Sequence, residues 1–279
     1  MGTDSVGTAG RISKCFTAVK QSGRPVLVAY LCVGDPSLAD SEACALAALE
    51  AGADILELGV PFSDPTADGA VIAAASFRAI QHEGSLRATL KVAASLRSKT
   101  QAPLVLFSYY NPIFTYGDEA LVDAAKASGI DAILVVDLPP EEGEALRVRA
   151  TAQDIAVVPL LAPTSDAERE RRAFARASGF IYYVSVTGVT GAATLSANEA
   201  GQAAASIRKR ANLPVVVGFG IDSAAKAQAI AAQGVDGVVV GTAIVKAVEN
   251  GKTTAERCAN VKELIAGLRQ GISGQGISG

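Results

Sequence analysis

The sequence predicts a single α/β domain, a (β/α)8 barrel of the TIM type with an extra helix at its amino-terminal end. Short β-branched runs alternate with longer Ala-rich segments of helical period along the chain, and 279 residues is an ordinary length for one such barrel. The runs are apolar on both faces, which is typical of a parallel sheet covered by helices. Eight predicted strands begin at Val26, Asp54, Pro103, Asp131, Ile155, Phe180, Pro214 and Val235.

The main structural alternative is an open, doubly wound sheet. That fold carries a GxGxxG turn after its first strand when it binds a dinucleotide, and the segment after VLVAYLC has no such motif. The barrel is therefore the favoured prediction.

The predicted helices follow the strands in order. RISKCFTAVKQ, before the first strand, is predicted as the extra helix, and four later helices end in a glycine suited to a left-handed C-cap: SEACALAALEAG, EALVDAAKASG, SDAERERRAFARASG and SAAKAQAIAAQG. No linker marks a second domain. We therefore expect a flexible N-terminus at residues 1–10, a catalytic barrel domain at 11–268 and a disordered tail at 269–279, where the low-complexity repeat GISGQGISG occurs.

Composition narrows the classes of partner and location. A net charge of −3 and a pI near 5.4 provide no basic surface for nucleic acid. The four cysteines are scattered without CxxC spacing, as expected in a reducing compartment. No apolar run is long enough for a membrane span, and no secretory leader is recognisable. A cytoplasmic protein that binds neither membranes nor nucleic acid is predicted.

The predicted active face carries two acids near the second strand. In a barrel the loops after the strands form this face. Glu57 ends the apolar strand DILELGV, where an ionised carboxylate without a partner is costly. Asp68 follows eleven positions later in the loop VPFSDPTADG, and the two carboxyls can face one substrate. Apolar surroundings that raise the pKa suit Glu57 to acid–base chemistry, whereas Asp68 on a more polar loop suits an ionised role.

Glycines after the last two strands indicate an anion site. Gly218 and Gly220 follow the seventh strand, and Gly241 with Thr242 opens a helical segment after the eighth. Backbone N–H groups and a helix N-terminus at this place commonly hold phosphate in barrels. The long loop at 186–201, rich in Gly, Thr and Ala, is predicted to be a mobile lid.

Several motifs in fixed order carry a family resemblance. ELGVPFSDPTADG, DLPPEE, YYVSVTGVTG, GFGI and VVGTAIVK together resemble the tryptophan synthase alpha subunit family from about Arg11 to about Leu268. The resemblance implies cleavage of indole-3-glycerol phosphate to indole and glyceraldehyde 3-phosphate. It also implies transfer of indole to a beta subunit in an α2β2 heterotetramer, with pyridoxal phosphate on the beta partner and no cofactor or metal on this chain.

The resemblance also assigns residues. It implies that Glu57 and Asp68 are catalytic, with Asp68 holding the indole N–H, and that Thr190 in the lid meets Asp68 on closure. Implied substrate contacts are Tyr182, Thr190, Gly191, Phe219, Gly220, Gly241 and Thr242. Implied contacts with the beta partner are Asp64, Pro65, Asn111 and Pro112.

Other interpretations of these residues stay open. Glu57 can be a salt-bridged structural residue, Asp68 an N-cap or turn residue, and the glycines simple turn formers. Tyr109 and Tyr110 are more typical of packing residues than of contact residues. His82 is typical of a surface residue at a helix end. A free-standing indole-releasing lyase, a sugar-phosphate isomerase or epimerase, and a non-catalytic activating subunit remain alternative functions.

Overall fold

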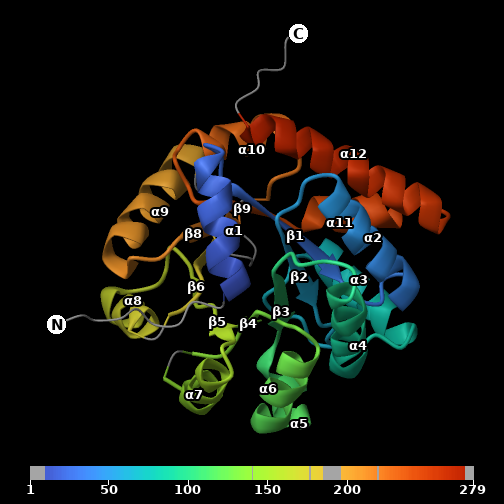
Figure 1. Cartoon of the computed structure of the whole chain (residues 1–279), viewed down its shortest axis with the longest axis horizontal. Helices are drawn as coiled ribbons and strands as arrows, with labels where there is room; N and C mark the ends of the chain where they lie inside the picture. The colour runs from blue at the N-terminus through green and yellow to red at the C-terminus, as the bar shows by residue number, and fades with distance from the viewer. Residues whose placement is uncertain (1–9, 140, 176, 185–195, 219, 274–279) are drawn as a thin grey trace.

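All strands form one parallel sheet that curls into a barrel. The computed structural model describes residues 10–139, 141–175, 177–184, 196–218 and 220–273. Within them the strand order is β5-β4-β3-β2-β1-β9-β8-β7-β6 (Figure 1). The strands are β1 Val26–Cys32, β2 Ile55–Gly59, β3 Leu104–Ser108, β4 Ala132–Val135, β5 Ala156–Val157, β6 Leu160–Leu161, β7 Ile181–Val184, β8 Val215–Gly218 and β9 Gly237–Val240.

The ring closes through a broken strand. β5 and β6 are the two halves of the predicted fifth strand, and β5 pairs with β4 while β6 pairs with β7. At the break, Val158 N donates to Ile133 O at 2.9 Å, and Pro159 O accepts from Tyr182 N at 3.0 Å. One segment thus joins both edges of the sheet, so the predicted eight-stranded barrel is confirmed in the described part of the chain.

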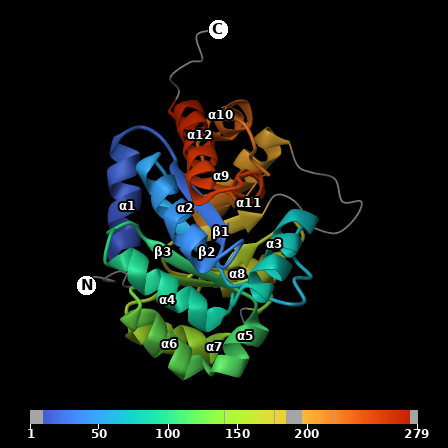
Figure 2. The same cartoon turned by 90° about the vertical axis from the view of Figure 1, so that its right-hand side faces the viewer.

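Helices cover the outside of the barrel (Figures 1 and 2). α1, the predicted extra helix, packs Ile12, Phe16 and Val19 against the barrel interior and lies on the side away from α3 and α5 (Figure 2). None of the described helices is long and apolar enough to span a membrane. The helices are α1 Gly10–Gln21, α2 Leu38–Glu50, α3 Ala70–Gln81, α4 Leu86–Arg97, α5 Tyr110–Tyr116, α6 Asp118–Ala127, α7 Glu144–Ala152, α8 Ala167–Phe174, α9 Ala197–Ala211, α10 Ala224–Ala231, α11 Thr242–Glu249 and α12 Thr254–Ile272.

Three helix ends follow the glycine pattern in the sequence. The four glycines predicted to close helices all have positive φ, namely Gly52, Gly129, Gly179 and Gly234. Gly52, Gly129 and Gly234 stand one or two residues after the C-caps of α2, α6 and α10, where a left-handed residue turns the chain without a Cβ clash. The predicted helix end at Gly179 is wrong, because α8 already ends at Phe174. The last helix differs from expectation in length, because α12 continues to Ile272, beyond residue 268.

The barrel interior is apolar up to its carboxyl end. Side chains that alternate along the strands point inward and pack with Phe180 and α1. The inward set includes Val26, Val28, Ile55, Val105, Ala132, Leu134, Ala156, Val158, Tyr182, Val216 and Val239. Glu57 lies in the layer above Ile55, where the strands end.

Three aspartates lock strand register at the amino end of the barrel. Each stands one residue before a strand, and its backbone N–H and its carboxylate both bond to one residue of the neighbouring strand. The pairs are Asp54 with Leu27, Asp131 with Leu104 and Asp236 with Val215. Arginines neutralise the carboxylates: Arg24 on Asp54, Arg97 and Arg11 on Asp131, and Arg208 on Asp236. Each lock therefore holds a strand pair in one register while keeping its buried charge compensated.

We expect Asp131→Ala to lower the free energy of unfolding by about 3 kcal/mol, because it leaves the Leu104 N–H and two guanidinium groups without their acceptor. Urea denaturation measures the change. Asp123→Ala is the matched control: its ion pair with Arg149 is exposed and is expected to contribute less than about 1 kcal/mol. Equal losses in both variants would contradict the register-lock interpretation.

Candidate active site

Glu57 is a fully buried carboxyl at the end of β2. It pairs in register with Tyr30 of β1 and Val105 of β3, so its side chain points inward above Ile55. It has no solvent exposure, and neither carboxyl oxygen has a hydrogen-bond partner among the described residues. Burial raises the pKa of Glu57 from the ordinary 4.5 to about 8. The carboxyl is therefore mostly protonated at neutral pH, and the salt-bridged structural interpretation is not supported.

Asp68 lies in the loop between β2 and α3, half-buried, and does have a partner. The Tyr109 hydroxyl donates to Asp68 Oδ2 at 3.1 Å and accepts from the Ala67 N–H at 2.9 Å. Burial raises the pKa of Asp68 to about 6, while the bond from Tyr109 acts in the opposite direction. The N-cap of α3 is Gly69, so Asp68 does not take the capping role. Asp68 is thus mostly ionised at neutral pH, as the sequence suggested.

Aromatic side chains form walls around the two acids. The Tyr30 and Phe107 rings meet edge-on with centroids 5.3 Å apart. The Tyr30 hydroxyl lies over Gly59, where any Cβ would collide with it. Burial raises the pKa of Tyr182, and the nearby carboxyls of Glu57 and Asp68 add to the effect. Tyr182 therefore lies within electrostatic range of both acids, and its predicted contact with the substrate stays a prediction.

Two tyrosines were not recognised as site residues from the sequence. Tyr30 was not singled out, although its inward position on the strand beside Glu57 was a usable signal. Tyr109 was considered a packing residue, but its hydroxyl holds Asp68. That contact joins positions 41 residues apart, so no local pattern in the sequence marks it.

The amino end of α11 offers an anion site. Its N-cap, Gly241, makes no side-chain cap, and the first helical bond runs from Val245 N to Gly241 O at 3.0 Å. The N–H groups of Thr242 and the next two residues therefore have no acceptor within the helix. Gly220 has a φ of +60°, which favours glycine, and Gly241 packs on the Tyr30 ring. Donors for an anion thus adjoin the aromatic wall.

Three predicted substrate contacts, Thr190, Gly191 and Phe219, lie outside the described residues. The same holds for residues 186–195 of the predicted lid. From Ser196 onward the segment belongs to α9, which begins with a capping box between Ser196 and Glu199. The roles of these three residues stay predictions.

The predicted partner contacts fall in two segments beside the acids. Asp64 and Pro65 lie in the loop that also carries Asp68, and Asn111 and Pro112 lie in α5. In α5 the Phe114 side chain is 69 % exposed. Phe114 was not singled out from the sequence. A single exposed apolar side chain is common on a protein surface, but Phe114 lies on the same helix as the predicted partner contacts Asn111 and Pro112.

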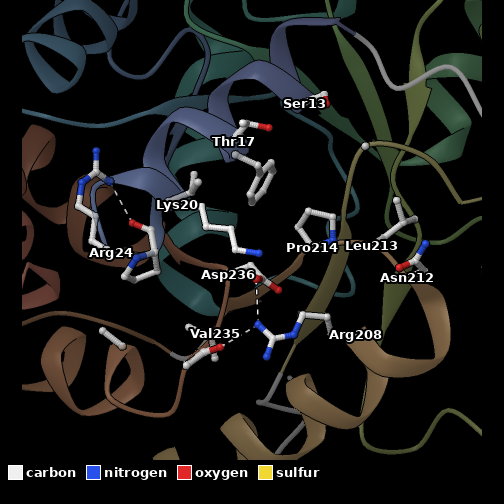
Figure 3. A pocket seen from close by; sticks show the side chains of 17 residues that line it. Ser13, Thr17, Lys20, Arg24, Arg208, Asn212, Leu213, Pro214, Val235 and Asp236 are labelled. Carbon is white, nitrogen blue, oxygen red and sulfur yellow. Dashed lines mark hydrogen bonds and ion pairs between the residues drawn. The ribbon is translucent and has the colours of Figure 1, made fainter. Parts of the chain in front are cut away.

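Two large grooves lie elsewhere, on either side of α1. They enclose about 600 and 860 Å³. Figure 3 shows the first groove, in which Arg208 contacts Asp236. The charged side chains that line these grooves include those of the aspartate–arginine pairs that hold the strand register. These pairs lie at the amino end of the barrel, which is the end opposite Glu57. We therefore place the candidate chemistry at the carboxyl end.

Known proteins match nearly the whole chain. Residues 16–273 match the family described as "Tryptophan synthase alpha chain". The tryptophan synthase alpha chain of Geotalea daltonii is 46% identical over 266 residues, which cover 95% of this chain and 99% of that protein. That of Geobacter sp. strain M21 is 45% identical, covering 94% and 97%.

Solved structures agree with the sequence matches. The crystal structure of tryptophan synthase subunit alpha from Legionella pneumophila superposes with a TM-score of 0.86 at 31% identity, covering 94% of this chain and 98% of that one. A chain in a structure of Mycobacterium tuberculosis tryptophan synthase gives 0.85 at 32% identity, with the same coverage.

Glu57→Gln should make the protein more stable at neutral pH. Because the pKa of Glu57 is raised in the folded state, the carboxyl is protonated in both states below about pH 4.5, and its burial does not lower the free energy of unfolding there. Above that pH the carboxyl ionises in the unfolded state only, so the free energy of unfolding falls as the pH rises towards about 8. The glutamine variant avoids this cost. We expect equal stability at about pH 4.5 and an advantage of about 3 kcal/mol for the variant at about pH 7. Urea denaturation at the two pH values checks this, and parallel curves for both proteins would disprove it.

Proposed function

The chain belongs to the tryptophan synthase alpha chain family, and from that premise we propose that it cleaves indole-3-glycerol phosphate to indole and glyceraldehyde 3-phosphate. The observation that carries the proposal is the fully buried Glu57 carboxyl, which has no partner among the described residues, together with Asp68 on the loop that follows the same strand. The reaction is a retro-aldol cleavage, which makes the chain a carbon–carbon lyase.

Glu57 suits both proton transfers. Protonated at neutral pH, it donates its proton to the indole ring carbon that bears the glycerol chain. The resulting carboxylate then accepts the proton of the neighbouring glycerol hydroxyl. As that O–H bond breaks, the oxygen forms the aldehyde, and the electron pair of the broken carbon–carbon bond returns to the ring. One carboxyl therefore serves as acid and then as base.

Asp68 suits stabilisation of the ring. Protonation of the ring carbon places positive charge on the ring nitrogen, and an ionised carboxylate that accepts its N–H stabilises that charge. Tyr30, Phe107 and Tyr182 provide apolar surface for the indole ring. An aromatic wall and a second acid suit an indole better than a sugar phosphate, so the isomerase alternative has no observation in its favour.

The phosphate of the substrate is proposed to bind the N-terminus of α11. Backbone N–H groups at Gly220, Gly241 and Thr242 provide the donors, and Gly191 joins them in the predicted arrangement. Glu57 accounts for both proton transfers and Asp68 for stabilisation of the ring charge, so we propose that this chain uses no cofactor. Pyridoxal phosphate is expected on the beta partner.

A beta subunit is the proposed partner, in an α2β2 heterotetramer within the cytoplasm. Support comes from the exposed Phe114 on α5 and from Asp64 and Pro65 on the loop that carries Asp68. Indole is small and apolar and escapes readily, so a direct route to the partner is useful to a tryptophan-producing cell. A free-standing lyase is the remaining alternative, in which the isolated chain would release indole as fast as the complex.

Glu57→Gln is expected to reduce indole release from indole-3-glycerol phosphate by about a thousandfold or more, because the amide keeps the shape but transfers no proton. Asp68→Asn is expected to lose about a hundredfold at saturating substrate. Indole release by the purified chain measures both. Asp123→Asn, at an exposed ion pair on the outer helices, is the matched control. Activity of Glu57→Gln within about tenfold of wild type would refute the role of Glu57.

Gly241→Val should weaken substrate binding, because a branched side chain would crowd the N–H groups at the start of α11. We expect the KM to rise by about tenfold or more with a smaller change in kcat, and inhibition by inorganic phosphate to weaken in parallel. Gly267→Ala in α12 is the control, since an added Cβ there meets no atom within 4 Å. An unchanged KM for Gly241→Val would place the phosphate elsewhere.

A further inference from the structure

We infer that Tyr109 is a positioning residue that couples a partner seated on α5 to the placement and charge of Asp68. The inference rests on the proposed function and names a means by which the partner regulates that same site. Tyr109 is the last residue before α5 and is 3 % exposed, so it lies between the surface helix and the acid.

Tyr109 holds the acid loop at both ends. Its ring packs against Phe62, near the start of the loop, with centroids 5.2 Å apart. Its hydroxyl accepts from Ala67 N and donates to Asp68 Oδ2, at the end of the loop. Displacement of this one side chain therefore moves the whole loop relative to the barrel mouth.

α5 connects Tyr109 rigidly to the surface. The Tyr110 N–H, in the first residue of the helix, donates to Asp137 Oδ1 at 2.7 Å, which ties the helix start to the segment after β4. Ile113 is fully buried, whereas Phe114 beside it is 69 % exposed and its ring lies 6.1 Å from that of Tyr110. A partner that contacts Phe114 and displaces α5 would therefore also displace Tyr109, the N-cap residue of that helix.

The bond to Asp68 can be strengthened. Its O···O distance of 3.1 Å is long for an O–H···O⁻ bond, for which about 2.5 to 2.7 Å is typical. Burial raises the pKa of Asp68, and this bond is the counteracting influence. A partner that moves α5 towards the barrel would shorten the bond and favour the ionised acid that the ring nitrogen requires.

Few other groups respond in the same pH range. The titratable side chains that act on or near Asp68 come from four strands or strand ends in the described structure: Tyr30 and Cys32 of β1, Glu57 of β2, Tyr109 after β3 and Tyr182 of β7. The tyrosine and cysteine pKa values are raised, so these groups stay neutral. Glu57, with a pKa of about 8, titrates on the alkaline side of Asp68. The acid limb of the rate profile therefore reports Asp68 and the substrate phosphate, whose second pKa is about 6. A shift of that limb caused by a substitution in the protein reports Asp68.

The test is Tyr109→Phe, which removes only the hydroxyl. We expect the acid limb of kcat/KM for indole release to move by about one pH unit to higher pH, because the carboxylate loses its donor. Above that limb the rate should approach wild type. Stimulation by the tryptophan synthase beta chain of the same source should fall by about tenfold. Tyr183→Phe is the control, since Tyr183 is a buried tyrosine on β7 whose side chain packs in the outer core.

Two further variants keep the result interpretable. Phe62→Leu keeps the hydroxyl and removes the ring contact, so it should shift the same limb in the same direction by less. Phe114→Ala should raise the beta-chain concentration needed for half-maximal stimulation, and stimulation should return at saturation.

Tyr109→Phe with a wild-type pH profile and wild-type stimulation would overturn the inference. So would a folded Tyr109→Phe protein that is inactive at every pH, because that result would make Tyr109 a catalytic residue. Both outcomes leave the proposed function standing, provided that the wild-type chain releases indole. Absence of indole release by wild type, with and without the beta chain, would instead reject the proposed function itself.

Discussion

Burial of the Glu57 carboxyl in an apolar barrel is the constraint on which the active end depends. The inward side chain below it on β2, Ile55, is apolar, and no described side chain bonds to the carboxyl, which keeps its proton at neutral pH. Such a group destabilises the folded state at neutral pH. The opposite end of the barrel compensates, because three aspartates with arginine partners hold the strand register there. Stability and chemistry are thus separated along the barrel axis.

The two acids differ because their surroundings differ. Glu57 lies on a strand and accepts no hydrogen bond from the described residues, whereas Asp68 lies on a loop and accepts a bond from Tyr109. Burial raises the pKa of both, to about 8 and about 6. At neutral pH one is therefore mostly an acid and the other mostly an anion, which is the pair of states that cleavage of a carbon–carbon bond to an indole ring requires. The environment, not the residue type, assigns the roles.

Most of the fold could be predicted from local pattern. Apolar runs of strand length located the strands, and Gly52, Gly129 and Gly234 located three helix ends, because glycine takes positive φ without strain. The break of the fifth strand into β5 and β6 was not predicted. It arises from ring closure, because the fifth predicted strand must form backbone hydrogen bonds with two neighbours, β4 and β7, that diverge. Within the site, Glu57, Asp68 and Tyr182 were predicted together, whereas Tyr30, Tyr109 and Phe114 were not.

By itself the sequence determined the barrel class, the end of the barrel that carries the chemistry and the two carboxyl groups, since these follow from periodicity and from an acid in an apolar run. Only the tertiary structure decided which neighbours those carboxyls have. The Tyr109 bond to Asp68 joins segments on different strands, and the absence of a partner for Glu57 among the described residues depends on every inward side chain around it. Charge state depends on such surroundings, and these form only when distant strands close into a ring.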